Sequence, residues 1–133
     1  MIDIEEDVIN AVATAVQQTY PNILVLPETV YAPPEYPCIC IEESDNYVLQ
    51  RTRDSGAIEN NAVVVYEVNV YSTKSNNKLS EARAIFSVVD AAFEQLGFAR
   101  TVLTRIAMAD ATKQRLFGRY TAVTDKNKTI YRR

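Results

Sequence analysis

The chain has no histidine and no tryptophan, and it has only two cysteines and three glycines among its 133 residues. Without histidine, a Ser-His-Asp triad, a histidine base and every histidine-containing zinc site are excluded. The three glycines lie too far apart to build a phosphate-binding glycine loop. No apolar run approaches the roughly 18 residues of a membrane span. The residues therefore predict a protein with no catalytic group, no cofactor, no metal and no membrane segment.

What the chain does contain is typical of a folded domain. Hydrophobic residues make up 47% and charged residues 23%, which predicts a single domain over residues 1–133 with one core. The N-terminus is acidic where a secretory signal would be basic, so we expect a cytoplasmic start. Cys38 and Cys40 are two apart, so on a strand both thiols leave the same face, and we expect them to stay reduced. A two-thiol metal site would need further ligands, which the sequence does not offer.

The charges are sorted along the chain. Residues 1–49 hold nine acidic and no basic side chains, residues 50–99 hold six acidic and five basic, and residues 100–133 hold two acidic and nine basic, which gives −9, −1 and +7. The acidic and basic parts should attract each other. They can meet within one subunit or between neighbouring subunits, and the sequence favours neither. Nucleic-acid binding by the basic third is a weaker alternative because the whole chain is acidic.

The first half predicts one helix, a crossover and two short strands. Asp3 is a candidate N-cap, and apolar residues at three-to-four spacing predict a helix over residues 3–19. All five prolines lie between residues 21 and 37, so residues 20–37 should form an extended proline-rich crossover with an edge strand at 23–26. Strands at 38–42 and 47–52 are expected to join through a turn at 43–46, whose acidic side chains would form a solvated rim. A polar loop follows at 53–61.

The second half predicts a long strand, a helix and two more strands. Alternating apolar residues predict a strand at 62–72, in which Glu67 should pair with a strand arginine. A regular apolar stripe predicts a helix at 77–96, ended by Gly97. Strands at 98–107 and 113–124 precede a basic tail at 125–133. The expected fold class is α+β, a mostly antiparallel sheet with two helices packed on one face.

The order of several short motifs resembles a known family. They are Pro37-Cys38-Ile39, Glu42-Glu43-Ser44-Asp45-Asn46, the segment from Tyr66 to Ser72, Asp90 with Phe93 and Leu96-Gly97-Phe98, and Gly118-Arg119-Tyr120-Thr121-Ala122. Together, over about residues 5–131, they resemble small proteins of Gram-positive phages and prophages that are similar to the tail terminator, or tail-to-head joining, family of long-tailed phages. This chain has Lys113-Gln114 where the family pattern has an apolar-aromatic pair.

The resemblance implies a structural virion protein without catalysis or cofactor. It implies a ring, expected to be a hexamer, that caps the tail tube and joins it to the head or collar. Its partners would be further copies of the chain and the tail tube protein, with sheath and head-completion proteins as further candidates. DNA would only pass through the bore, which acidic residues should line. The protein would be found in the host bacterial cytoplasm during assembly and then in the virion or phage-like particle.

The residues expected to form subunit or tube contacts lie at the end of the strand at 47–52, in the polar loop, in the last long strand and in the tail. They are Arg51, Arg53, Asp54, Glu59, Arg115, Arg119, Lys126, Lys128 and Arg132. Three alternatives remain. Within the same class, the chain is a head-completion or minor capsid protein at the head-tail connector. Outside it, the chain is a small dimeric ligand-binding or enzymatic α+β domain, or a DNA-binding module.

Overall fold

Two helices and six strands make up the described part of the protein. The computed structural model describes residues 1–30, 32–48, 61–73 and 78–132. In chain order the elements are α1 (Glu5–Thr19), β1 (Leu24–Leu26), β2 (Cys38–Val48), β3 (Asn61–Ser72), α2 (Lys78–Leu96), β4 (Ala99–Ile106), β5 (Gln114–Asp125) and β6 (Ile130–Arg132).

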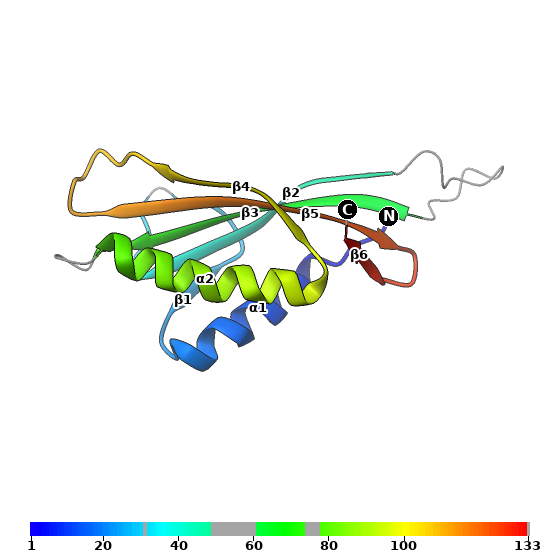
Figure 1. The fold of residues 1–133 in the computed structure, drawn as a ribbon, viewed down its shortest axis with the longest axis horizontal. Coiled ribbons are helices and arrows are strands. Elements are labelled where there is room, and N and C mark those ends of the chain that lie inside the picture. The colour runs from blue at the N-terminus through cyan, green and yellow to red at the C-terminus, as the bar shows by residue number, and fades with distance from the viewer. Residues whose placement is uncertain (31, 49–60, 74–77, 133) are drawn as a thin grey trace.

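The strands form one sheet in the order β1-β2-β3-β5-β4 (Figure 1). β1 runs parallel to β2, and all other pairs are antiparallel. The short strand β6 pairs with the last part of β5, beyond the residues that β4 covers. The first half of the chain therefore occupies one edge of the sheet, the second half occupies the other, and β3 lies between them.

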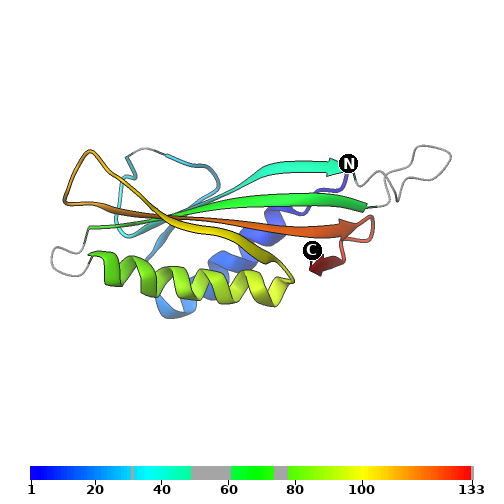
Figure 2. The same cartoon turned by 45° about the horizontal axis from the view of Figure 1, so that its top comes forward.

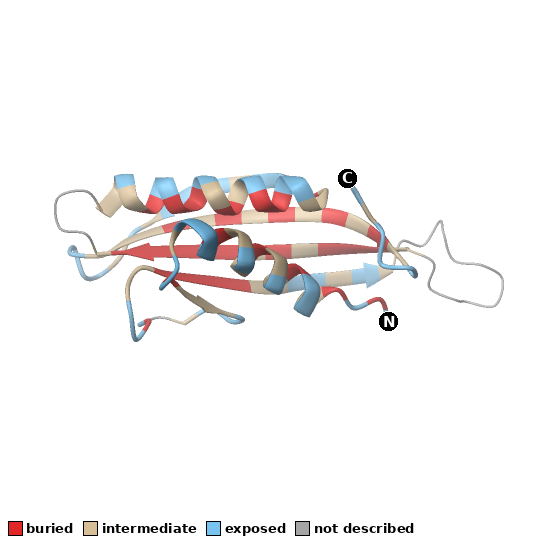
Figure 3. Ribbon diagram, turned by 90° about the horizontal axis from the view of Figure 1, so that it is seen from below, coloured by how far each residue is buried: buried red, intermediate tan, exposed pale blue. Residues whose placement is uncertain are grey.

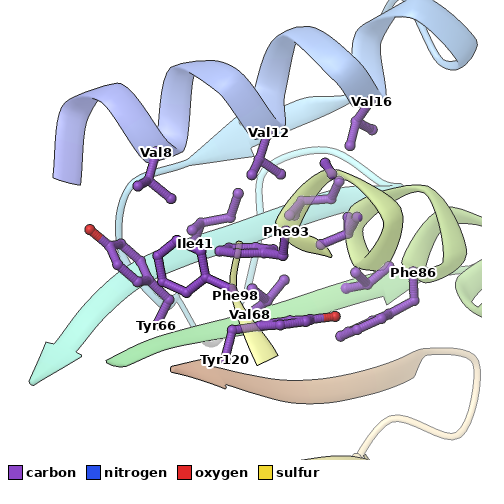
Figure 4. Packing of buried hydrophobic residues seen from close by; sticks show 14 of the residues in the cluster. Val8, Val12, Val16, Ile41, Tyr66, Val68, Phe86, Phe93, Phe98 and Tyr120 are labelled. Carbon is purple, nitrogen blue, oxygen red and sulfur yellow. The ribbon is translucent and has the colours of Figure 1, made fainter. Parts of the chain in front are cut away.

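Both helices pack on the same face of this sheet (Figure 2), as the two apolar stripes predicted. From α1, Val8, Val12 and Val16 point into the core, and the longer helix α2 buries a stripe that includes Phe86 and Phe93 (Figures 3 and 4). The core is contributed by alternate strand residues, because successive side chains of a strand point to opposite faces. The class predicted from the sequence, an α+β fold with a mostly antiparallel sheet, is confirmed.

Aromatic rings fill the space between α2 and the middle of the sheet. Phe93 stacks on Tyr120 with ring centroids 4.2 Å apart, and Tyr66 meets Phe98 edge-to-face at 5.4 Å. Phe86 lies above Gly118 of β5, where an added Cβ would be only 2.4 Å from the ring. The missing side chain at this position lets the helix approach the sheet closely.

Gly97 ends α2 as the sequence predicted. It has φ of +98°, its N–H donates to the carbonyl of Glu94 at 3.0 Å, and the N–H of Phe98 donates to the carbonyl of Phe93 at 3.0 Å. This is the Schellman motif, which satisfies the last helical carbonyls and needs a residue that tolerates positive φ. α1 begins at Glu5 rather than residue 3. Asp3 still accepts a hydrogen bond from the Glu5 N–H at 3.2 Å.

The second face of the sheet is covered only in part. The segment after β1 lies over Cys38, Cys40 and Tyr71, whose hydroxyl donates to the carbonyl of Val30 at 2.9 Å. Tyr36 packs edge-to-face on Tyr71 at 6.5 Å. The predicted crossover is therefore a structural layer of its own, because its apolar residues cover one end of this face.

The prediction of two strands joined by a turn was wrong. Residues 38–48 form one strand, with a bulge between Glu43 and Asp45, and not two strands with a turn. The polar residues stay extended because Tyr66 donates to Glu43 at 3.0 Å and the Asn46 side chain donates to the carbonyl of Ile2 at 2.8 Å.

The predicted basic tail at 125–133 is not a simple tail. Asp125 ends β5, and Ile130–Arg132 form β6. Asp125 accepts hydrogen bonds from the N–H groups of Asn127 and Thr129, both at 2.9 Å, and Lys128 adopts φ of 65°. These bonds close a turn that returns the chain to β5. Neither helix of the described chain combines the length and the apolarity that a bilayer crossing requires.

Candidate functional site

A basic groove lies between α2 and the edge strand β4. Arg83 and Ser87 come from the helix, Arg100 and Arg105 from the strand, and the volume is about 500 Å³. Its apolar lining is Phe86, Leu103 and Leu116, and the Leu103 side chain is 44% exposed. The three arginines meet here because Arg100 and Arg105 pair with Tyr120 and Leu116, whose side chains face the helices. We call this the α2–β4 groove.

One arginine of the groove is neutralised by its own chain. Arg100 Nη1 lies 3.2 Å from Asp90 Oδ1, which also accepts a hydrogen bond from the Tyr120 hydroxyl at 2.8 Å. Burial raises the pKa of Tyr120 well above its usual value, and the bond to Asp90 raises it further. Tyr120 therefore stays a neutral donor. In the described residues no carboxylate lies within ion-pair distance of Arg83 or Arg105.

An acidic hollow lies at the opposite edge, at the start of α1. Asp3, Glu5 and Glu6 line it together with Ile9, Asn10 and Pro27, and its volume is about 450 Å³. The carboxylates of this hollow also affect the pKa of the neighbouring Glu43. Burial raises the pKa of Glu43, its hydrogen bonds from Tyr66 and Asn46 lower it, and the charges of Glu5 and Asp3 raise it further. We call this surface the α1 acidic hollow.

The face of the sheet away from the helices carries pairs between the middle and the end of the chain. Arg119 Nη2 lies 2.9 Å from Glu67 Oε2, which confirms the expected pairing of Glu67 with a strand arginine. Arg115 Nε donates to Asn69 Oδ1 at 2.8 Å. Both arginines thus have partners on β3, and because they are partly exposed, these pairs contribute little to stability.

The same face carries an apolar row where β6 joins the sheet. Tyr47, Val63, Val123 and Tyr131 are direct cross-strand neighbours on β2, β3, β5 and β6. The two tyrosines at the ends of the row are 43% and 50% exposed. Val63 within the row is buried, so the exposed apolar surface consists of the two tyrosines at its ends.

The two cysteines are free and completely buried. Hydrogen bonding to Cys40 and burial raise the pKa of Cys38, whereas the bond from Cys38 and the charge of Arg115 lower the pKa of Cys40. Among the described residues no group of three metal-ligating side chains exists. The thiols pack beneath the crossover with Tyr71, so they serve this small second core.

The residues predicted as contacts fall into three places. Arg51, Arg53, Asp54 and Glu59 lie outside the described residues. Arg115 and Arg119 lie on β5 and bond within the chain, as above. Lys126 is exposed in the turn before β6, Lys128 Nζ is 4.0 Å from Asp7 Oδ2, and Arg132 belongs to β6. The structure does not bring Arg115 and Arg119 close to the turn. Both lie nearer the start of β5, whereas the turn follows the end of β5 at Asp125.

The position of neither charged surface could be predicted from the sequence. Arg83 lies on the exposed side of α2, and its approach to Arg100 and Arg105 depends on how the helix docks against β4. In the sequence, Asp90 stands out only as part of a motif, and its contacts with Arg100 and Tyr120 could not be predicted. The available signal was the −9 and +7 segregation of charge, which predicted the two signs without their positions.

The two surfaces differ in the chemistry they present. Arginines over an apolar floor recognise a carboxylate with adjoining hydrocarbon, since guanidinium groups bind carboxylates through paired hydrogen bonds. The acidic hollow offers carboxylates beside Ile9 and Pro27. The described part of the molecule is thus an α+β domain with two concave surfaces of opposite charge.

A family model described as the MukF winged-helix domain matches residues 56–133, more than half of the chain. By this match the chain belongs to that family. No curated protein matches the chain. The described residues of the matched segment form β3, α2, β4, β5 and β6, and α2 leads directly into β4. A helix-turn-helix needs two consecutive helices, so the described part of this segment does not have the fold that the family description names.

Proposed function

We propose that the chain is a structural subunit that forms a ring, expected to be a hexamer, and caps the tail tube of a long-tailed phage or phage-like particle. In this role it joins the tube to the head or collar. The motif order resembles that of tail terminators, and the α+β class agrees with the fold which that resemblance implies. The matched winged-helix family adds nothing to this role, because the described part of the matched segment does not contain a helix-turn-helix.

The observation that carries the proposal is the separation of charge across the sheet. The acidic residues 1–48 lie on the α1, β1 and β2 side, and the basic strands β4 and β5 lie on the other. A subunit whose two sides differ in this way associates head to tail, and a head-to-tail contact closes into a ring when its rotation fits. A two-fold contact through either edge alone would instead place like charges opposite each other.

The predicted contact residues keep a part in this proposal at the β6 end of the sheet. Lys126, Lys128 and Arg132 lie there beside the row from Tyr47 to Tyr131. Segment 49–60 connects to the same end, since Val48 pairs with Ala62 and Asn61 pairs with Asp125. We assign this end to the tube or head contact, and the two edges to contacts between subunits. Acidic groups are expected to line the bore so that DNA passes without being held.

The experiment is a measurement of mass and shape. Sedimentation of the full chain over a range of concentrations and salt, alone and with tail tubes, should give a particle of six times 15.0 kDa. Negative-stain images should show rings with a central opening at tube ends. A stable dimer, a chain that stays monomeric even with tubes, or rings bound to the portal side instead would contradict the proposal. The last result would favour the head-completion alternative.

The alternative of a small ligand-binding domain is favoured by one feature, the α2–β4 groove with its apolar floor and three arginines. It predicts a stable dimer that binds a small anionic molecule. The same sedimentation experiment separates the two functions, because a groove reserved for a small ligand does not require a ring. Saturable binding of a small anion by a dimer would replace the tail-terminator proposal.

A further inference from the structure

The α1 acidic hollow and the α2–β4 groove lie too far apart to form ion pairs with each other within one molecule. The acidic hollow lies beside α1 and the residue after β1, whereas the basic groove lies on β4 at the other end of the strand order. Neighbouring strands are about 4.8 Å apart, so four steps place the edges about 19 Å from each other. Each surface is therefore open to a second molecule.

The positive charge of the α2–β4 groove is only partly balanced by acidic side chains among the described residues. Asp90 engages Arg100, but Arg83 and Arg105 face no carboxylate among the described residues. Leu103 adds an exposed apolar contact at the same place. A groove of this composition fits an acidic surface that also presents hydrocarbon.

The acidic hollow has the matching composition. Residues 1–50 contain no lysine or arginine, and Lys128, which lies 4.0 Å from Asp7, forms no ion pair with Asp3, Glu5 or Glu6 among the described residues. Ile9 and Pro27 border these carboxylates and supply the apolar part. Its volume is about 450 Å³, close to the groove's volume of about 500 Å³.

We propose that the start of α1 of one copy docks into the α2–β4 groove of the next copy, with Glu5 and Glu6 facing Arg83 and Arg105. This inference deepens the proposed function and rests on it, because it names the contact that closes the ring. Two basic grooves or two acidic hollows repel each other, so the contact joins different surfaces of neighbouring copies. Charge complementarity thus sets the direction of assembly.

Charge reversal tests the pairing. The variant Arg83→Glu/Arg105→Glu and the variant Glu5→Lys/Glu6→Lys should each weaken association at least about ten-fold, with folding checked by circular dichroism. A mixture of the two variants should assemble again, because each groove then meets an edge of opposite sign. The matched control Asp110→Lys/Lys113→Glu reverses two charges in the turn between β4 and β5, outside both surfaces, and should leave the ring intact.

A disulfide test reports the same contact when association is weak. A chain with Glu6→Cys mixed with a chain with Ser87→Cys should form a mixed disulfide dimer, and neither chain should dimerise alone. A chain with both changes should form a ladder up to the closed ring. The pair Glu6→Cys with Lys126→Cys is the control and should not cross-link. The native cysteines do not compete, because both are buried.

The possible results separate this inference from the proposed function. If the wild-type chain forms rings but the reversals leave them unchanged and the mixed disulfide does not appear, the inference is wrong and the ring remains. If no oligomer forms under any condition, with or without tubes, both are wrong. If Arg83→Glu/Arg105→Glu abolishes binding to DNA while the mass of the particle is unchanged, the groove serves nucleic acid, and the inference is overturned.

Discussion

Replacing Gly118 by alanine tests how closely α2 approaches the sheet. The added Cβ would lie 2.4 Å from Phe86 Cζ, about 1 Å closer than ordinary contact. The ring cannot swing into solvent, because Phe86 is 2% exposed and packs along Tyr120. Overpacking of this kind costs about 1–3 kcal/mol, against a gain of about 0.4–1 kcal/mol from reduced freedom of the unfolded chain. We expect Gly118→Ala to destabilise the protein by about 1–2 kcal/mol.

Urea unfolding followed by circular dichroism measures this effect. The midpoint should fall with an unchanged slope, and the melting temperature should fall by about 4–7 °C, because the unfolding entropy of a chain of this length is about 0.28 kcal/mol/K. Adding Phe86→Leu should recover at least part of the loss, since it removes the overlapping atoms. Gly97→Ala is the matched control, because its loss comes from positive φ and Phe86→Leu should not recover it. A Gly118→Ala protein as stable as the wild type would refute the close approach.

Two further changes test buried polar groups. Burial raises the pKa of Glu43, so between its ordinary value and the raised one the folded state binds more protons than the unfolded state, and stability falls as pH rises. Glu43→Gln should therefore gain stability relative to the wild type as pH rises from about 4 to 7, and a pH-independent difference would contradict this. Thr124 Oγ1 is buried without a hydrogen-bond partner in the described residues. Thr124→Val should raise the free energy of unfolding by about 1 kcal/mol, and a loss would show that the hydroxyl has a partner.

The elements with regular patterns could be predicted from the sequence. The stripe of α2, the alternation of β3 and the stop at Gly97 are local signals, and the structure confirms each of them. Local periodicity succeeds here because the residue that faces the core is decided by its spacing along one element.

The failures lie where distant contacts decide the backbone. The polar run from Glu43 to Asn46 has the composition of a turn, yet Tyr66 and the carbonyl of Ile2 bond it in an extended form. The basic residues after Asp125 suggested a tail, yet the Asp125 side chain closes a turn into β6. The α2–β4 groove depends on the docking of a helix on an edge strand, which no single segment of the sequence encodes.

The order of the strands explains how sorted charge along the chain becomes sorted charge in space. Because β3 separates β2 from β5, the acidic first part and the basic last part cannot form one mixed ladder. β3 supplies Glu67 and Asn69 to Arg119 and Arg115, so these two arginines of β5 are engaged at the centre of the sheet. Among the described residues, the two arginines of the groove without an acidic partner are Arg83 on α2 and Arg105 on the edge strand β4. At this edge a neighbouring copy can reach them. An assembly driven by this arrangement should weaken as salt rises, because exposed charges are screened within about 8–10 Å at physiological ionic strength. A ring whose stability did not change with salt would have to be held by the apolar parts of the two surfaces, and reversing the charges would then leave it intact.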